Sequence, residues 1–423
     1  MKLRMPSPVI LAVILSASLG YAVDLFDTFL LPALRVPTLR DLGVPSASSL
    51  VVGTNVFNLQ LFGQALGALL LWGPLADRRG RSKAMYFSII LYGLANIATA
   101  FAPSVLVFAC VRFVAGVGLG GQLGAGIALI SESIQNPRYR TIGTQLVGTI
   151  GMLGVVGAGV LAKSHLSWRT DFLIGGGLAL LTIVFSLATR ESSLYKQSAA
   201  ASRSSYWTTF AYLCRPTKLL KLIACILIGS PVFFVVGLLV SGAPEFGEAM
   251  GMHTKPTSAD ALVWTYVSIS VGNLLCGFII PLFQSRRLAI LLFHIITAVG
   301  IAILLFAHGS TPSDYYMRCA LTGLGIGSWA SLVTNATEQW GTNVRGLVTI
   351  AVPNFIRLCL FPISAVFLWL KPAYGFVHAA AIVGFAVIGI AIVCTLILKD
   401  GYLRTLAFDE PIVEAPLVTA SVE

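Results

Sequence analysis

Long apolar runs alternate with short polar stretches along the whole chain. A membrane-spanning helix needs about 20 mostly apolar residues, and a helix satisfies its own backbone polar groups, as lipid requires. The pattern therefore predicts an all-α membrane protein with twelve transmembrane helices. The predicted spans cover residues 9–31, 50–72, 84–101, 105–130, 142–162, 172–188, 222–241, 261–283, 288–307, 315–335, 347–370 and 375–398.

A basic, serine-containing stretch divides these spans into two sets of six. The division predicts an N-terminal six-helix bundle at 1–189, a cytoplasmic linker at 190–221, a C-terminal six-helix bundle at 222–399 and a cytoplasmic tail at 400–423. Most Lys and Arg residues fall in loops on the linker side, so the positive-inside rule places both termini in the cytoplasm. Because the loops on the other side are short, we expect a bacterial inner-membrane protein.

The composition excludes several classes of protein. Hydrophobic residues make up 57% of the chain and charged residues 11%, which is too few to cover a water-soluble surface. A soluble enzyme, a nucleic-acid-binding module and a disordered protein are therefore excluded. The cysteines and histidines are dispersed, without metal-ligand spacing or a nucleophile–base cluster. We expect no metal site, no enzymatic activity and no cofactor, with protons as the coupling ion.

The two halves of the chain repeat each other at a constant offset, close to half the chain length. Arg112-x3-Gly116 is followed by glycines at every second position, and the same glycine pattern begins again at Gly323. Pro74 and Pro281 are separated by that same offset. Two pseudo-symmetric six-helix halves are typical of secondary transporters, which bind their substrate between the halves.

The loop between the second and third predicted spans reads Gly73-Pro-Leu-Ala-Asp77-Arg78-Arg-Gly80-Arg81. An acid ends one helix, a glycine permits a tight turn and an arginine opens the next helix, so the loop can pair in one conformation and release in another. The segment resembles the Gly-x-x-x-Asp-Arg-x-Gly-Arg motif of the major facilitator superfamily. The resemblance implies two bundles that rock around a central site, with these residues as conformational gates.

The segment after the tenth span also resembles a gating pattern of that family. It runs from Glu338 to Arg345, which a glycine follows. In the first half its counterpart begins at Glu132, whose partner is either Arg138 or Arg140. The resemblance implies that these acids and arginines hold the cytoplasmic side closed.

Ionisable residues inside a span are costly and usually mark a pathway or a paired structural site. Asp24 and Asp27 in the first span share a helix face, and their proximity favours the neutral form of one of them. Arg112 in the fourth span lies at a similar depth. We expect Asp27 to carry the proton, with Asp24 and Arg112 beside it. The alternative is that one aspartate is a helix-end acid near the outer surface. The set resembles the proton-coupling residues of sugar porters and of aromatic acid–proton symporters.

Arg357 lies near the middle of the eleventh predicted span, with Asn354 on the same face. An unpaired buried guanidinium is costly, and a carboxylate or phosphate substrate can complete it through a bidentate contact. The alternative is a structural ion pair with Asp24 or Asp27 across the two bundles. Further candidates for polar and stacking contacts with the substrate are Gln122, Gln145 and Trp329.

These features predict a secondary active transporter. We expect proton-coupled symport of a small organic anion by alternating access, in a monomer surrounded by lipid and without a nucleic-acid partner. The alternatives are a sugar, polyol or phosphate symporter, a proton-driven efflux antiporter, and a membrane sensor or scaffold on the same fold. The seventh span lacks the glutamine motif of sugar porters, and the glycine-rich fifth span lacks the proline of efflux antiporters. Both absences favour the organic anion.

Overall fold

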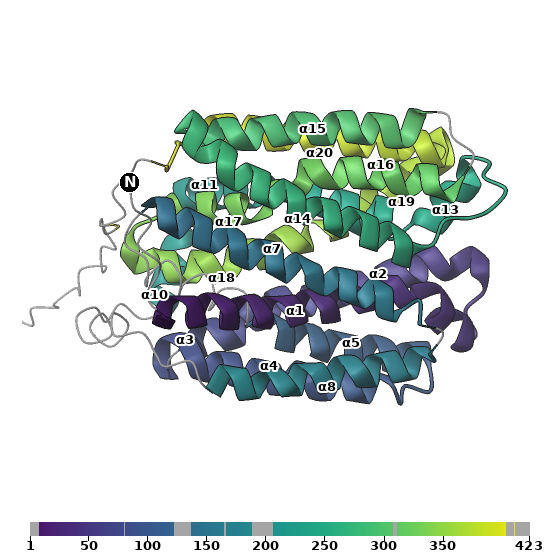
Figure 1. The fold of residues 1–423 in the computed structure, drawn as a ribbon, viewed down its shortest axis with the longest axis horizontal. Coiled ribbons are helices and arrows are strands. Elements are labelled where there is room, and N and C mark those ends of the chain that lie inside the picture. The colour runs from purple at the N-terminus through teal and green to yellow at the C-terminus, as the bar shows by residue number, and fades with distance from the viewer. Residues whose placement is uncertain are drawn as a thin grey trace, which may run out of the picture.

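The computed structural model describes residues 8–79, 81–121, 137–164, 166–187, 206–307, 311–402 and 410. Within these ranges all regular structure is helical. The axes of the long helices are roughly parallel to one another, and the chain runs back and forth along them (Figure 1). We call the end at which the first helix begins the near end, which lies at the left in Figure 1, and the opposite end the far end.

All six spans predicted for the first half fall on helices. These helices are α1 (Pro8–Asp41), α2 (Ser46–Gly67) with its continuations η1 (Ala68–Trp72) and α3 (Gly73–Arg79), α4 (Arg81–Thr99), α5 (Val105–Leu119), α7 (Pro137–Leu161) and α8 (Trp168–Leu187). The apolar pattern ends at 31, whereas α1 continues through Pro32 and Pro37. Membrane helices tolerate proline where neighbouring groups satisfy the freed backbone groups. The second part of the span predicted at 105–130 lies outside the described residues.

The six spans predicted for the second half also fall on helices. They are α11 (Pro216–Leu227) with α12 (Ser230–Phe234) and η2 (Val235–Val240), α14 (Ser258–Phe283), α15 (Arg286–Phe306), α16 (Pro312–Gly325) with η3 (Ile326–Ser328) and α17 (Trp329–Glu338), α18 (Thr342–Leu358) with α19 (Leu360–Tyr374), and α20 (Phe376–Ile397). The pair α11 and α12–η2 is bent by 44°. Pro231 is the second residue of α12, where its missing N–H is tolerated because the first turn of a helix has no donor bonds to make within the helix.

Two short helices lie outside the predicted spans. The first, α10 (Tyr206–Leu213), occupies part of the stretch predicted as a linker, and α13 (Ala243–Ala249) follows η2 at the far end. Of the predicted linker, residues 190–205 lie outside the described residues. The proposed domain boundaries stay a prediction.

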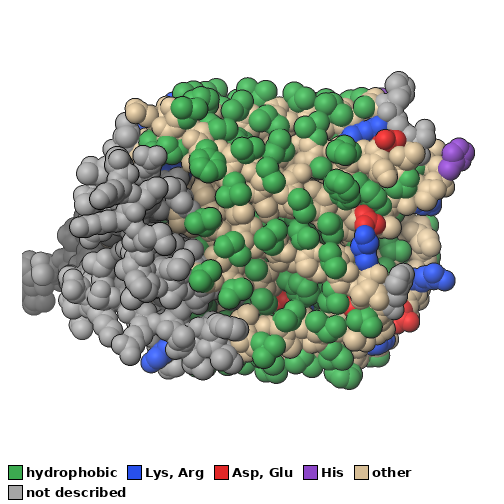
Figure 2. Space-filling view, in the orientation of Figure 1, with side chains coloured by type: hydrophobic (Ala, Val, Ile, Leu, Met, Phe, Trp, Pro, Cys, Tyr) green, Lys and Arg blue, Asp and Glu red, His purple; other side chains and the backbone are tan. Residues whose placement is uncertain are grey.

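Six of the described helical segments are long and apolar enough to cross a membrane, and the bent pair makes a seventh. In Figure 2, hydrophobic side chains cover the middle of the visible face, and charged side chains gather toward the far end. This distribution suits a bilayer, where a charged side chain is costly near the centre.

The helices form two packed groups. In the first, α1 packs against α7 and α8, α2 against α5, and α4 against α5 and α8. In the second, α16 packs against α14 and α15, and α20 against α15 and α19. The groups meet along two seams, α7 against α14 and α2 against α18. Figure 1 shows α4 and α8 at the bottom, α15 and α20 at the top, and α7 beside α14 between them.

The repeated glycines mark equivalent close approaches in the two bundles. A Cβ at Gly116 would lie 2.0 Å from the carbonyl oxygen of Gln60, and one at Gly323 would lie 2.5 Å from that of Thr265. Small residues let membrane helices pack backbone to backbone. The glycine pattern therefore repeats in the two halves because both bundles contain the same close helix contact.

Replacing Gly154 by alanine is expected to lower the thermal unfolding temperature by about 2–4 °C or more. Its Cβ would stand 1.8 Å from the carbonyl oxygen of Ala22, so α7 and α1 must move apart. Gly177→Ala is the control, because nothing lies within 4 Å of its added Cβ. Scanning fluorimetry of both purified variants is the measurement, and equal unfolding temperatures would contradict the expectation.

Candidate functional site

The charged pair at the centre of the molecule joins the two bundles. Arg357 on α18 donates from Nη2 to Oδ2 of Asp24 on α1 at 3.1 Å, and both side chains are fully buried. Of the two alternatives left open by the sequence, the structure therefore contains the ion pair with Asp24.

This pair leaves hydrogen-bonding capacity unused. Among the described residues, Nε and Nη1 of Arg357 and Oδ1 of Asp24 have no hydrogen-bond partner. Buried polar groups are rarely left unpaired, since each costs about 1–3 kcal/mol. The guanidinium can therefore donate from Nε and Nη1 to a second anion while its bond from Nη2 to Asp24 is kept.

Aromatic side chains from both bundles form a connected group on one side of the pair, which they reach through Tyr21 and Tyr266. Trp329 donates from Nε1 to the hydroxyl of Tyr21 at 2.7 Å, which links α17 to α1. The ring of Phe233 lies 6.1 Å from that of Trp329. Tyr21 and Tyr266 both lie close enough to Arg357 to interact with its charge. Trp329 was predicted as a site residue, whereas Tyr21, Phe233 and Tyr266 were missed, although Tyr21 lies one helical turn before Asp24.

The second buried acid stands in the first bundle. Arg112 donates from Nε to Gln60 at 3.1 Å, from Nη1 to Asn96 at 2.5 Å, and from Nη2 to the backbone carbonyl of Asp27 at 3.5 Å. Among the described residues, no donor of good geometry reaches either carboxylate oxygen of Asp27. The structure thus places Asp27 beside Arg112 without a direct carboxylate–guanidinium hydrogen bond. A Cβ at Gly175 on α8 would lie 2.9 Å from Oδ1 of Asp27.

Gln145 and Asn354 lie at the two seams. The Gln145 side chain donates to the hydroxyl of Ser331 at 2.6 Å, and the backbone carbonyl of Gln145 accepts from the amide of Asn273 at 3.0 Å, so Gln145 ties α7 to the second bundle. Asn354 donates to Ile350 of its own helix at 2.8 Å and to Gly120 of α5 at 3.4 Å. Gln122 lies outside the described residues.

The predicted gates are described only in part. Gly73 packs against the ring of Tyr206, whose hydroxyl would lie 2.5 Å from an added Cβ. Glu338 accepts from Arg286 at 3.0 and 2.9 Å. Arg345 donates to the carbonyl of Trp340 at 3.0 Å. Gly80, Glu132 and the side chains of Asp77, Arg78, Arg81, Arg138 and Arg140 lie outside the described residues. Arg286 was not predicted as a gate residue, although it lies five residues after Pro281, the counterpart of Pro74 in the loop motif.

Two ion pairs at the far end join the bundles and were not predicted. Arg35 on α1 bonds both carboxylate oxygens of Glu245 on α13, each at 2.8 Å. Lys163 after α7 pairs with Asp260 on α14. Partners on different bundles cannot be matched from sequence, because nothing local relates them. These two contacts hold the two bundles together at the far end.

Glu245→Gln is expected to shift the molecule toward a state open at the far end by about fivefold to thirtyfold, because removing one partner of a part-buried pair leaves Arg35 uncompensated. Spin labels at Ser46 and His253, one on each bundle, measure the separation of the bundles by electron double resonance. The matched control is Glu248→Gln, whose pair with Lys255 is exposed. Identical distance distributions for the two variants would contradict the expectation.

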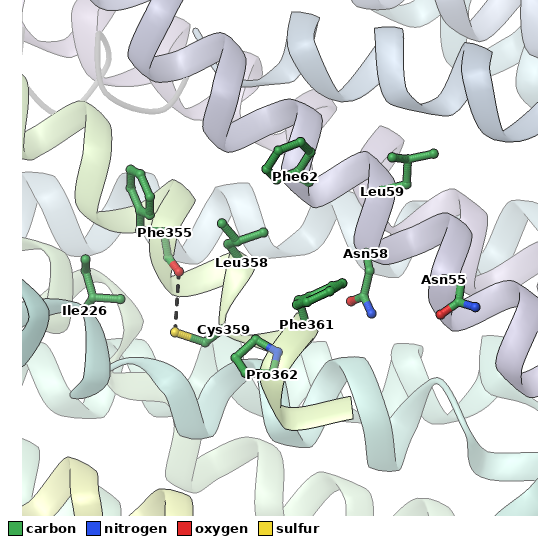
Figure 3. A pocket seen from close by; sticks show the side chains of 10 residues that line it. All are labelled: Asn55, Asn58, Leu59, Phe62, Ile226, Phe355, Leu358, Cys359, Phe361 and Pro362. Carbon is green, nitrogen blue, oxygen red and sulfur yellow. Dashed lines mark hydrogen bonds between the residues drawn. The ribbon is translucent and has the colours of Figure 1, made fainter. Parts of the chain in front are cut away.

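A cavity of about 750 Å³ lies at the second of the two seams, where α2 meets α18 and α19. Figure 3 shows Phe62 and Leu59 on α2 facing Phe361 and Leu358 on the opposite segment. Asn58 closes the seam nearby by donating to Ser364 at 2.9 Å. None of the predicted substrate residues lines this cavity, so it is not the predicted substrate site.

The comparisons with known proteins agree with this architecture. The chain is 33% identical over 181 residues to the niacin transporter NiaP of Acinetobacter baylyi, a match that covers 42% of this chain and 40% of the relative. It is 30% identical over 286 residues to the 3-(3-hydroxyphenyl)propionate transporter of Escherichia coli, which covers 65% and 66%. It is 27% identical over 344 residues to a probable 4-methylmuconolactone transporter of Cupriavidus pinatubonensis, which covers 77% and 76%. The chain spans less than half the length of the first curated relatives that it matches.

Solved structures show the same fold. The proton:xylose symporter XylE bound to 6-bromo-6-deoxy-D-glucose superposes with a TM-score of 0.70 at 16% identity, over 95% of this chain and 98% of that one. A family model described as the Major Facilitator Superfamily matches residues 17–358. The twelve-helix arrangement predicted from the sequence is thereby confirmed, and the chain belongs to the Major Facilitator Superfamily of multi-pass membrane transporters.

Proposed function

We propose that this transporter carries small organic acids, aromatic carboxylates in particular, by proton-coupled symport. The observation that carries the proposal is the buried Arg357, which keeps two unused donor nitrogens among aromatic side chains. A guanidinium binds a carboxylate in a bidentate fashion. The rings of Trp329, Tyr21 and Phe233 offer edges and faces to an aromatic substrate. Relatives named for niacin and 3-(3-hydroxyphenyl)propionate support this substrate class.

Asp24 links the proton to the substrate. As a carboxylate it occupies one donor of Arg357. Once protonated it loses its charge, and the substrate carboxylate takes its place as the counter-ion of Arg357. A neutral total charge at the buried site is then kept in both states, which a low-dielectric interior favours. Gln145 and Asn354 make hydrogen bonds between the two bundles at the seams beside the site, and these bonds break or form when the bundles move.

Asp27 is the carboxyl through which the coupling proton enters and leaves the site, and Arg112 positions it. Arg112 is held by Gln60 and Asn96, so its charge remains beside Asp27 whether or not the carboxyl is protonated. The two bundles then rock about the seams, with the far end closed by its ion pairs. In the opposite state the near end, which we assign to the cytoplasm of a bacterial inner membrane, is closed by the loop motif that Gly73 begins. The remaining proposed gate residues are Asp77, Arg78, Gly80, Arg81, Glu132, Arg140, Glu338 and Arg345.

The test is an uptake screen in proteoliposomes with and without an inside-alkaline pH gradient. The probes are niacin, 3-(3-hydroxyphenyl)propionate, cyclohexanecarboxylate, xylose and phosphate. We expect the two aromatic acids to accumulate only with the gradient, and cyclohexanecarboxylate to be carried at least tenfold more slowly. Uptake of xylose or phosphate alone would overturn the substrate class, and uptake that ignores the gradient would overturn the proton coupling.

A further inference from the structure

A row of polar side chains runs through the interior of the first bundle. Gln60 and Gln64 lie one helical turn apart on α2, and Ser88 and Asn96 lie two turns apart on α4. All four side chains are fully buried. Polar side chains inside a membrane protein either hydrogen-bond to neighbouring helices or mark a pathway.

Much of this row has no partner in the protein. Among the described residues, both amide atoms of Gln64, the hydroxyl of Ser88, Nδ2 of Asn96 and the hydroxyl of Thr28 make no hydrogen bond. The two carboxylate oxygens of Asp27 also accept no hydrogen bond from the described residues. Buried polar groups that lack a protein partner are paired with ordered water.

The glycines of α5 give the direction of the row. Arg112, which contacts Asn96 and Gln60, lies at the level of Asp27. Directly after the end of α5, a Cβ at Gly120 would lie 2.3 Å from the carbonyl oxygen of Gln64, and one at Gly121 would lie 3.0 Å from the hydroxyl of Ser88. Since α5 runs toward the near end, the row extends about 14 Å from Asp27 in that direction.

The second bundle provides an internal comparison. Gly118 abuts the amide of Tyr92, and the equivalent Gly325 abuts the amide of Thr297, which sets the register between α4 and α15. The counterparts of Ser88 and Asn96 in this register are the buried Phe293 and Ile301.

The same comparison for α2 and α14 rests on Gly116 and Gly323, which abut Gln60 and Thr265. In this register the counterpart of Gln64 is Ile269, which is also buried. The fold therefore does not require polar residues at these positions, and in the first bundle they serve another purpose.

We propose that this row is a hydrated path inside the first bundle, through which Asp27 exchanges its proton with the near end of the molecule. The inference rests on the proposed proton coupling, and it separates the proton path from the substrate path between the bundles. In the step itself, the O–H bond of the Asp27 carboxyl breaks, a water oxygen accepts the proton, and the carboxylate remains. The charged groups that face Asp27 among the described residues are Arg112 and Asp24, and the α8 side offers Gly175.

Radiolytic hydroxyl-radical footprinting of the wild-type protein in nanodiscs tests the hydration without any substrate. Radicals formed from water inside the path modify adjacent rings. Tyr92 on α4 and Tyr315 on α16 are equally buried tyrosines, one in each bundle. We expect Tyr92 to be modified at least fivefold faster than Tyr315. Equal rates would overturn the hydrated path, whether or not transport proves proton-coupled.

A double variant tests the role of the path in proton exchange. In Gln64→Leu/Ser88→Ala, uptake of 3-(3-hydroxyphenyl)propionate driven by a pH gradient should fall at least tenfold. Exchange of the same acid across the membrane at equal pH needs no net proton release and should stay within twofold. The control is Thr99→Val, whose hydroxyl bonds its own helix at Ala95. Unchanged driven uptake, or equal loss of both rates, would overturn the proposal.

Discussion

Arg357→Ala is expected to reduce uptake of aromatic carboxylates by at least a hundredfold. The substitution removes the guanidinium that pairs with Asp24 and lies near Tyr21 and Tyr266. A bidentate guanidinium–carboxylate contact in a buried site is not replaced by water. Initial rates with radiolabelled niacin in proteoliposomes measure the effect.

The simple alanine variant has a second consequence, because it leaves Asp24 buried without its partner. An uncompensated buried charge costs about 3–5 kcal/mol, so poor folding alone would also reduce uptake. The double variant Arg357→Ala/Asp24→Asn removes both charges and should keep the unfolding temperature near that of the wild type. It should still fail to carry niacin. Wild-type uptake by this double variant would show that the arginine only holds the bundles together.

Arg357→Lys separates charge from geometry. Lysine keeps the positive charge opposite Asp24, but it offers a point charge instead of the planar fork of arginine. We expect a folded protein whose apparent affinity for aromatic carboxylates is at least tenfold weaker. An unchanged affinity would mean that the substrate meets only the charge, and would remove the argument for a bidentate contact.

The elements of the fold could be predicted because their signals are local. Each span shows a continuous apolar run, and the glycines from Gly116 and from Gly323 repeat because both sets permit the same close helix contact. The extension of α1 to Asp41 was not predicted, since the apolar run ends at 31 and prolines follow. A hydrophobicity pattern marks the membrane portion of a helix and not its continuation beyond the bilayer.

The site could be predicted as a set of residues but not as a set of contacts. Asp24, Asp27, Arg112 and Arg357 stand out because charge is rare in apolar runs. Which of them meet depends on how helices far apart in sequence are rotated, and the sequence left both partners of Arg357 open. Arg112 illustrates the same limit, because its shortest hydrogen bonds are with the neutral Gln60 and Asn96 on neighbouring helices.

Asp27→Asn is expected to reduce proton-driven accumulation of 3-(3-hydroxyphenyl)propionate at least tenfold while leaving exchange at equal pH within about threefold. Asparagine has nearly the shape of a protonated aspartate, so the variant imitates the loaded carrier and cannot release its proton. Arg112 keeps its bonds to Gln60 and Asn96, and the local structure should persist. Accumulation and exchange are measured on the same proteoliposomes, with the internal pH followed by a trapped fluorescent dye.

A matched control, and a variant with a larger acidic side chain, show whether this result is specific to Asp27. Asp171 is also buried in the first bundle, in the first turn of α8, so Asp171→Asn should retain proton-driven accumulation. Asp27→Glu keeps the titratable group but adds a methylene where Gly175 already borders the carboxylate. We expect it to retain coupling at a lower rate, and Gly175→Ala to slow the wild type in the same way. If Asp27→Asn accumulates the acid as well as the wild type does, Asp27 is not needed for proton coupling, and protonation of Asp24 beside Arg357 suffices for it.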